Sequence, residues 1–351
     1  MFLFKRKKEV VGIDIGSSSV KVIQLRDIKG SFQLLNAGIF PLPPEAIVDN
    51  TLMDGSSITE AVKNLVSSLG IKTRDVACSI SGNSVIIRKI VLPVMPQEEL
   101  EDQIAWEAEQ YIPFDINDVN LDFQILSPDS DDSSKMNVLL VASKKDIIND
   151  YAAVFSGAGL QLSVVDVDSF AVQNAFETNY DYSSEDIIAL VNIGASVMNI
   201  NVIKDGITLF TRDVQMGGNL YSEEIQKQIG LSSEDAETAK MFANESTNKP
   251  LLNAILRVNE SITQEIRRSL DFYNSTASDD HISSVFVSGG CSKVYNLISM
   301  ISEKIGLPVE KINPFNKLKY NEKDFDPEYL QEISPFMVVP VGLAIRRVGD
   351  R

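Results

Sequence analysis

The sequence has few of the side chains on which metal binding and nucleophilic catalysis usually depend. Its 351 residues include one histidine, His281, and two cysteines, Cys78 and Cys291, which are far apart and in apolar surroundings. A zinc site or a serine–histidine triad therefore has too few residues to form. The cysteines fit reduced core thiols of a cytoplasmic protein better than a disulfide or a redox pair.

Basic residues are also scarce, since 32 Lys and Arg stand against 49 Asp and Glu and the formal net charge is −17. Such a chain lacks the basic surface that nucleic-acid binding needs. No apolar run is long enough to span a membrane, and Met1–Phe4 is too short for the core of a signal peptide. The basic stretch Lys5–Lys8 fits a solvated tail better than a membrane anchor, because stable anchoring usually takes a second signal.

What the sequence does contain is a pair of matching hairpins. Residues 10–22, VVGIDIGSSSVKV, predict two β-strands joined by a tight turn at Gly16, Ser17, Ser18 and Ser19. Residues 189–203, ALVNIGASVMNINVI, repeat the pattern 178 residues later. In this second copy Gly194 matches Gly16 and Ser196 matches Ser18. One hairpin in each half of the chain indicates two related domains.

The residues of the first hairpin suit a phosphate ligand. Gly16 lets a ligand approach the backbone, and free amides and hydroxyls bind phosphate oxygens. Asp14 ends a buried strand, where a carboxylate needs a partner, and a hydrated divalent cation on a phosphate is a natural one. A hairpin with an ordinary polar turn is the structural alternative for one copy. Two copies favour two turns that close on one polyphosphate.

A third motif is the pair Gly289-Gly290 in VFVSGGCSKV, where a strand gives way to a helix and a flat ring can lie against the backbone. With candidate crossing helices at 166–176 and 336–346, the motifs follow the order of the actin, sugar kinase and Hsp70 ATPase superfamily, which the chain resembles. The resemblance implies a two-domain α/β fold of the actin/Hsp70-like ATPase (ribonuclease H-like) class. The hairpins would be its phosphate loops and the glycine pair its adenosine motif.

Residues 83–157 interrupt that order with a strand, a helix, two further strands and another helix. An insertion here resembles the cell-division protein FtsA and the PilM family of type IV pilus assembly proteins, and WEAEQYIPFDINDVNLDFQIL at 106–126 is similar to PilM. We interpret Trp106, Ile112 and Phe114 within it as core packing at a helix end rather than as partner-binding residues.

The resemblance also implies domain boundaries. The expected units are a domain I core at 1–82 and 158–186, an inserted FtsA/PilM-type α+β subdomain at 83–157, a domain II core at 187–222 and 281–351, and a helical subdomain of domain II at 223–280.

The PilM resemblance implies an ATP-binding cytoplasmic scaffold of a type IV pilus or related type II secretion machine, peripheral at the inner membrane through its partners. In that family a groove in the first domain holds the short cytoplasmic N-terminal tail of the membrane protein PilN, and a PilN-like tail is the partner expected here. Contact with pilus assembly ATPases and self-association stay open. An FtsA-like polymer-forming division ATPase is the first alternative, and a small-molecule kinase of the same superfamily is the second.

The expected cofactors are ATP and Mg²⁺, with the magnesium at Asp14, partly through water. The residues expected around the nucleotide are Asp14, Gly16, Ser17, Ser18, Ser19, Lys21, Asn192, Gly194, Ala195, Ser196, Gly218, Gly289 and Gly290. In the superfamily a long helix, here 251–273, reaches over the nucleotide. Glu265 would then take the ribose hydroxyls and Arg268 would stack on adenine, whereas an i,i+3 ion pair is the alternative.

The second turn departs from the superfamily pattern. Asn192 stands where active ATPases usually carry Asp, and an amide has no charge and is a poor base. Water activation would then depend on Asp168, which aligns with an acidic residue of the Hsp70 pattern, and secondarily on Asp166. Either aspartate could instead cap the crossing helix. We therefore expect ATP binding with slow or no hydrolysis, and at most a weak ATPase.

Overall fold

The computed structural model describes residues 8–128, 132–277 and 281–350. Most of the basic N-terminal stretch, through Lys7, lies outside the described residues. Within the described residues, no helix is both long and apolar enough to cross a membrane.

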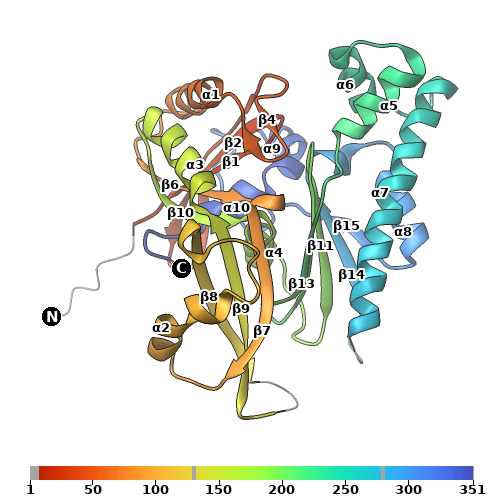
Figure 1. The fold of residues 1–351 in the computed structure, drawn as a ribbon. Helices are drawn as coiled ribbons and strands as arrows, with labels where there is room; N and C mark the ends of the chain where they lie inside the picture. Colours follow the sequence, from red (N-terminus) through yellow and green to blue (C-terminus); the bar gives the residue numbers. More distant parts are fainter. Residues whose placement is uncertain (1–7, 129–131, 278–280, 351) are drawn as a thin grey trace.

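Each half of the molecule is built on a five-stranded mixed sheet, and the two sheets have the same construction (Figure 1). The first has the strand order β10-β6-β1-β2-β3 and the second the order β15-β14-β11-β12-β13. In each, the central strand β1 or β11 pairs antiparallel with the next strand of its hairpin and parallel with β6 or β14. The duplication that the two hairpins indicated in the sequence therefore includes all five strands of each sheet.

The hairpins have the predicted strands. In the first sheet the bounds are Val11–Ile15 (β1), Ser19–Ile28 (β2), Ser31–Pro41 (β3), Asp75–Ile80 (β6) and Gln161–Val167 (β10). In the second they are Ile187–Ile193 (β11), Met198–Lys204 (β12), Ile207–Val214 (β13), Ser284–Ser288 (β14) and Val309–Lys311 (β15). A short hairpin of Ile47–Val48 (β4) and Thr51–Leu52 (β5) stands apart.

Helices cover both sheets. On the first sheet they are α1 (Gly55–Ser68) and α3 (Lys145–Gly157). On the second they are α5 (Asn219–Ile229), α6 (Ser233–Met241), α7 (Lys249–Thr276) and α8 (Leu297–Ile305), and α9 (Pro327–Ile333) follows near the C-terminus. α1 begins where Asp54 accepts a hydrogen bond from the Ser57 amide at 3.0 Å, and its apolar residues recur on the one face that is buried.

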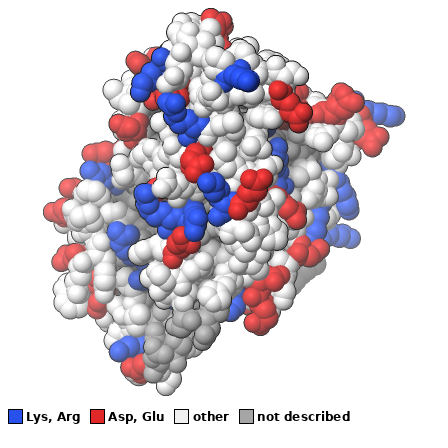
Figure 2. All heavy atoms as spheres, turned by 90° about the vertical axis from the view of Figure 1, so that its right-hand side faces the viewer, with Lys and Arg blue, Asp and Glu red and all other residues white. Residues whose placement is uncertain are grey.

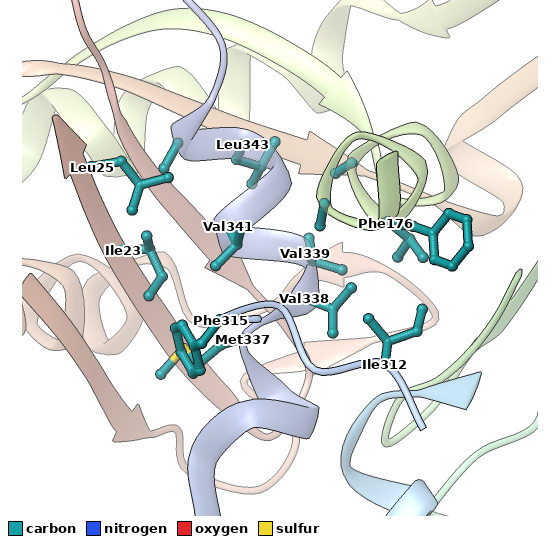
Figure 3. Close-up of a cluster of buried hydrophobic side chains, with 14 of the residues drawn as sticks. Ile23, Leu25, Phe176, Ile312, Phe315, Met337, Val338, Val339, Val341 and Leu343 are labelled. Atoms are coloured by element: carbon teal, nitrogen blue, oxygen red, sulfur yellow. The ribbon is translucent and has the colours of Figure 1, made fainter. Parts of the chain in front are cut away.

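The crossing helices are α4 (Asp168–Asn179) and α10 (Val338–Ala344), and they pack on each other between the two sheets. In Figure 3 the side chains of α10 point into a core that also receives Ile23 and Leu25 from β2 and Phe176 from α4. A Cβ placed at Gly342 of α10 would lie 1.8 Å from the carbonyl oxygen of Ala171 on α4. The two helices therefore touch backbone to backbone.

A third sheet lies within the predicted insertion, with the order β7-β9-β8. Its strands are Val85–Pro93 (β7), Val119–Pro128 (β8) and Lys135–Lys144 (β9), and α2 (Gln97–Ala108) covers one of its faces. The predicted insertion also included α3. That helix instead places Tyr151, Val154 and Phe155 in the core beneath the first sheet, so we propose the end of the inserted unit near residue 144 rather than 157. The other domain boundaries stay predictions.

The helix predicted at 97–111 ends at Ala108, and its aromatic residues have different surroundings. Ile112 is buried in the core of the inserted unit, as predicted, and the half-buried Phe114 packs against that core. Trp106 is 67% exposed, so its interpretation as a core residue is wrong. It follows Ile104 by two residues, which places it on the opposite side of α2 from the buried face.

Candidate functional site

The two glycine turns meet between the sheets. Gly16 donates to the carbonyl of Ser19 at 3.1 Å, and Gly194 donates to the carbonyl of Val197 at 2.9 Å, so the two turns close in the same way. The hydroxyl of Ser196 donates to that of Ser17 at 2.8 Å. In the described structure no backbone hydrogen bond has the amide of Ser17, Ser18, Ala195 or Ser196 as its donor. The two turns thus meet and carry amides that no backbone acceptor uses, an arrangement that fits phosphate oxygens.

Asp14 and Lys21 lie beside the first turn. The Lys21 ammonium is 2.9 Å from Oδ2 of Asp14 and 3.3 Å from the carbonyl oxygen of Ser19. A Cβ at Gly16 would lie 2.8 Å from the Lys21 nitrogen, so glycine leaves the room in which this ammonium sits. The sequence left the direction of Lys21 open, and in the structure it points at the turn and is buried.

The second hairpin carries a neutral version of that pair. Its register places Asn192 opposite Asn199, as that of the first places Asp14 opposite Lys21. The Asn192 amide donates to Oδ1 of Asn199 at 3.1 Å. Each asparagine stands 178 residues after its charged counterpart. Of the two hairpins, the first therefore carries a charged pair at these positions and the second an uncharged pair.

Three glycines hold the second turn in place. Gly218 donates to the carbonyl of Gly194 at 2.9 Å. A Cβ at Gly217 would lie 2.5 Å from that same oxygen, and one at Gly289 would lie 2.3 Å from the carbonyl oxygen of Ile193. Gly289 also has φ +84°, which favours glycine. The structure thus brings together Gly194, Gly218 and Gly289, which lie far apart in the sequence.

Lys240 and Glu237 on α6 adjoin this group, and the sequence did not single them out. Lys240 is only 6% exposed, and its ammonium lies 2.5 Å from Glu237 and 3.3 Å from the carbonyl oxygen of Gly218. Burial raises the pKa of the nearby Cys291 thiol to about 12. One feature of the sequence could have pointed to Lys240. It stands four residues after the apolar Ala236 and therefore shares the helix face that is buried. A cation and a carboxylate beside the glycine turns suit the polar parts of a nucleoside.

Glu265 and Arg268 form an ion pair with each other, and their predicted contacts with the nucleotide stay a prediction. Both carboxylate oxygens of Glu265 are occupied, one by Arg212 of β13 and the other by Arg268, each at 2.7 Å. This is the i,i+3 ion pair of the alternative interpretation, extended by a third residue. Figure 2 shows the face formed by α7 and α8, where basic and acidic side chains are interspersed. The ion pairs Arg267–Asp271 and Lys304–Glu260 belong to these helices.

The two candidate catalytic aspartates differ in their partners. Oδ2 of Asp166 is 3.2 Å from the guanidinium of Arg346, just after α10, so this residue ties β10 to the crossing helices. Asp168 accepts a hydrogen bond from Ser79 at 2.5 Å. Burial, and secondarily the Asp14 carboxylate, raises the pKa of Asp168 to about 6. Asp168 is therefore the better candidate for holding or accepting a proton.

Asp213 is a further carboxylate that sequence reasoning missed. It accepts from Asn199 at 2.8 Å and from the backbone amide of Gly82 at 2.5 Å. Burial raises the pKa of Asp213, and both hydrogen bonds oppose the rise. Gly82 follows β6 of the first sheet, whereas Asp213 belongs to β13 of the second. This contact therefore joins the two halves.

A magnesium ion fits the site only if a bound phosphate supplies some of its oxygen ligands. Across the residues described, no group of three or more His, Cys, Asp and Glu side chains is arranged to hold a metal. Mg²⁺ usually keeps several waters and takes one or two carboxylates together with phosphate oxygens, and a single aspartate such as Asp14 meets that requirement.

Two surface hollows flank α1. One lies between α1 and α3, where Leu52, Ala153 and Val154 supply apolar atoms and Glu60, Lys63 and Asp150 supply charge. The other lies between α1 and the end of β3. Both are open at the surface and belong to the first half of the chain.

Comparisons with known proteins agree on one fold. The profile of the family described as "Type IV pilus assembly protein PilM" matches residues 12–348. The solved PilM–PilN type IV pilus biogenesis complex is similar at 29% identity with a TM-score of 0.88, and the match covers 98% of this chain and 100% of that chain. MreB 5 of Spiroplasma citri bound to AMPPNP has a TM-score of 0.51 at 13% identity, covering 96% of this chain and 95% of that chain.

The cell division protein FtsA of Bacillus subtilis (strain 168) is 22% identical over 253 residues, which is 66% of this chain. The chain spans 57% of the length of that relative. These likenesses confirm the predicted two-domain actin-like ATPase fold.

Proposed function

The chain belongs to the PilM family of type IV pilus assembly proteins, and from this premise we propose that it is an ATP-binding scaffold of the inner-membrane assembly platform. Its place would be the cytoplasmic face of that membrane, where it is held through a PilN-like partner. The observation that carries the proposal is the contact of two equivalent turns, at which Ser17 and Ser196 share a hydrogen bond of 2.8 Å. The likeness to the PilM–PilN complex and the AMPPNP bound to MreB 5 support it.

In this proposal each group of residues has one task. The free amides and hydroxyls of the two turns bind the phosphates, and Lys21 neutralises part of their charge. Asp14 holds Mg²⁺, partly through water, and the cation screens the phosphate charge. Gly218 and Gly289 hold the second turn in place beside the nucleoside, and Lys240 and Glu237 bind the polar groups of the nucleoside.

Hydrolysis would be slow or absent. Asn192 has both of its amide atoms in hydrogen bonds, to Asn199 and to Ser288, and an amide is no general base. Asp168 is the remaining proton acceptor, and Ser79 already donates to it. The nucleotide would then act mainly by setting the arrangement of the two halves.

The partner would be the cytoplasmic N-terminal tail of a PilN-like inner-membrane protein. We place it in the hollow between α1 and α3, because that hollow joins an apolar floor to a charged rim and lies in the first domain. An extended segment with apolar side chains and a few polar contacts matches such a surface.

One experiment tests both parts. Purified protein is titrated by calorimetry with MgATP, and separately with a labelled peptide of the PilN-like tail by fluorescence anisotropy. We expect saturable binding of each. Ala153→Trp, which fills the hollow, should weaken tail binding by about tenfold and leave MgATP binding unchanged. The exposed variant Trp106→Ala is the control for the tail. Absence of any MgATP response would remove the nucleotide part of the proposal, and equal tail binding by Ala153→Trp would remove the assigned hollow.

A further inference from the structure

Four polar side chains form a row across the second sheet. Ser288 on β14 pairs in register with Asn192 on β11, Asn192 with Asn199 on β12, and Asn199 with Asp213 on β13. Their side chains are joined by hydrogen bonds of 3.1, 3.1 and 2.8 Å. Asn199 is 3% exposed and Ser288 is fully buried. Buried polar groups that satisfy one another in this way hold a fixed geometry.

The carboxylate at the end of the row sets its direction. An ionised Asp213 only accepts hydrogen bonds, so Asn199 must turn its NH₂ group toward it. The carbonyl oxygen of Asn199 then faces Asn192, which must donate with its own NH₂ group. The Asn192 oxygen is left to accept from Ser288. One charge on β13 thus orients the Asn192 amide on β11, two strands away and beside the second glycine turn.

The other carboxylate oxygen of Asp213 makes a contact outside the second sheet. It accepts from the amide of Gly82 at 2.5 Å, and Gly82 opens the short turn that leads directly into β7 of the inserted unit. Gly82 has φ +66°, and a Cβ there would lie 2.5 Å from Nδ2 of Asn50 and 3.1 Å from Nε2 of Gln215. The Asn50 amide in turn donates to the carbonyl of Ser81 at 2.8 Å. The first half therefore presents this amide from a tightly confined turn.

We propose that Asp213 is a positioning residue that couples the second glycine turn to the base of the inserted unit, through Asn199 and Asn192 on one side and the Gly82 amide on the other. This inference rests on the proposed function, because the two events it couples are nucleotide binding and tail binding. A nucleotide that moves the second turn displaces Asn192, the row transmits the change to Asp213, and the Gly82 turn responds at the start of β7.

The test measures coupling separately from binding. The affinity for the tail peptide is determined with and without MgATP in the parent, in Asp213→Asn, in Asp213→Ala and in Asn199→Ala. Couplings between sites are typically about 5- to 150-fold, and we expect a ratio in that range for the parent. The ratio should fall to about one in Asp213→Ala and Asn199→Ala. In Asp213→Asn, which keeps an acceptor for Gly82 but no longer dictates the direction of the row, it should be intermediate.

The control is Asp205→Asn, which removes one carboxylate from the turn between β12 and β13, outside the row. It should keep the parent ratio. Thermal unfolding of each variant identifies any that fails to fold. If one fails, the affinity ratio measured in Asp213→Asn, the mildest change, decides the test.

A second readout needs no partner. Hydrogen exchange at the Gly82 amide should be at least about tenfold faster in Asp213→Ala, because the acceptor that protects this amide is lost. MgATP should change the exchange rate of the same amide in the parent but not in Asn199→Ala. A parent that binds MgATP and the tail with a ratio of one, or an exchange rate at Gly82 that MgATP leaves unchanged, overturns the inference and leaves the proposed function standing. A parent that binds neither ligand overturns the proposed function instead.

Discussion

Asp14 and Lys21 face each other in register across β1 and β2, and their charged groups are 2.9 Å apart with side chains only 15% and 10% exposed. Removing one partner leaves the other buried without its counter-charge, which typically costs about 3–5 kcal/mol. We expect Asp14→Ala to destabilise the protein by an amount near the lower end of that range and to abolish the dependence of ATP affinity on magnesium. Urea unfolding and calorimetry with and without a chelator measure the two effects.

The double variant Asp14→Asn/Lys21→Met is the matched control for stability. It removes both charges at once and should recover a large part of the loss. If it is as unstable as Asp14→Ala, the pairing of these two charges is not the source of the cost.

The contact of α4 with α10 leaves no room for a methyl group. Gly342→Ala places a Cβ 1.8 Å from the carbonyl oxygen of Ala171, so the helices must separate, and we expect a loss of more than about 3 kcal/mol. Gly55→Ala is the control, since a Cβ there meets nothing within 4 Å and the residue begins α1. It should be neutral or slightly stabilising in the same urea titration. Equal stability of the two variants would contradict the contact.

The proposed function and the superfamily pattern place the nucleoside at different residues, and one pair of variants distinguishes the two placements. Lys240→Met keeps the buried stem of the side chain but removes the ammonium, and it should lower ATP affinity by about tenfold. Glu265→Gln should leave ATP affinity unchanged and reduce stability by about 1 kcal/mol, because its arginine pair is partly exposed. Calorimetry and thermal unfolding report the two quantities. The reverse order of ATP affinities would restore the assignment of Glu265.

Asp168 gives the stability a specific dependence on pH. Burial, with the Asp14 charge second, raises its pKa from 3.8 to about 6. Between these values the folded state holds a proton that the unfolded state has lost, so this residue stabilises the fold at low pH and the contribution disappears as the pH rises toward 6. Asp168→Asn should therefore gain stability relative to the parent across that window, by at most about 3 kcal/mol, and the difference should level off above it. A difference that does not change with pH would show that Asp168 titrates normally.

Local sequence signals were sufficient for the turns. Gly16 and Gly194 each follow a run of β-branched residues, and this pattern depends only on neighbours in the chain. The same holds for the glycine pair at Gly289-Gly290. The equal construction of the two sheets followed from the repeat, since a hairpin duplicated at a constant offset implies that what surrounds it is duplicated too.

Contacts between distant segments were not predictable in the same way. The row from Ser288 to Asp213 depends on the register of four strands, and no single strand shows which of its polar residues will align with those of its neighbours. The i,i+3 spacing of Glu265 and Arg268 is equally compatible with a ligand site and an ion pair, and it gives no sign that Arg212 of β13 also contacts Glu265. For Trp106, the aromatic residue alone suggested packing, but its side of α2 faces away from the sheet.

The equivalence of Asp14 with Asn192, and of Lys21 with Asn199, has a consequence for how a ligand enters. The backbone has approximate twofold symmetry, yet one half carries both a negative and a positive charge where the other carries two uncharged amides. Under the proposed function, a cation therefore has one charged binding position between the two turns rather than two equal ones. The protein would then fix the direction of a bound polyphosphate in advance, and a sequence change that restored the symmetry would make the two orientations compete.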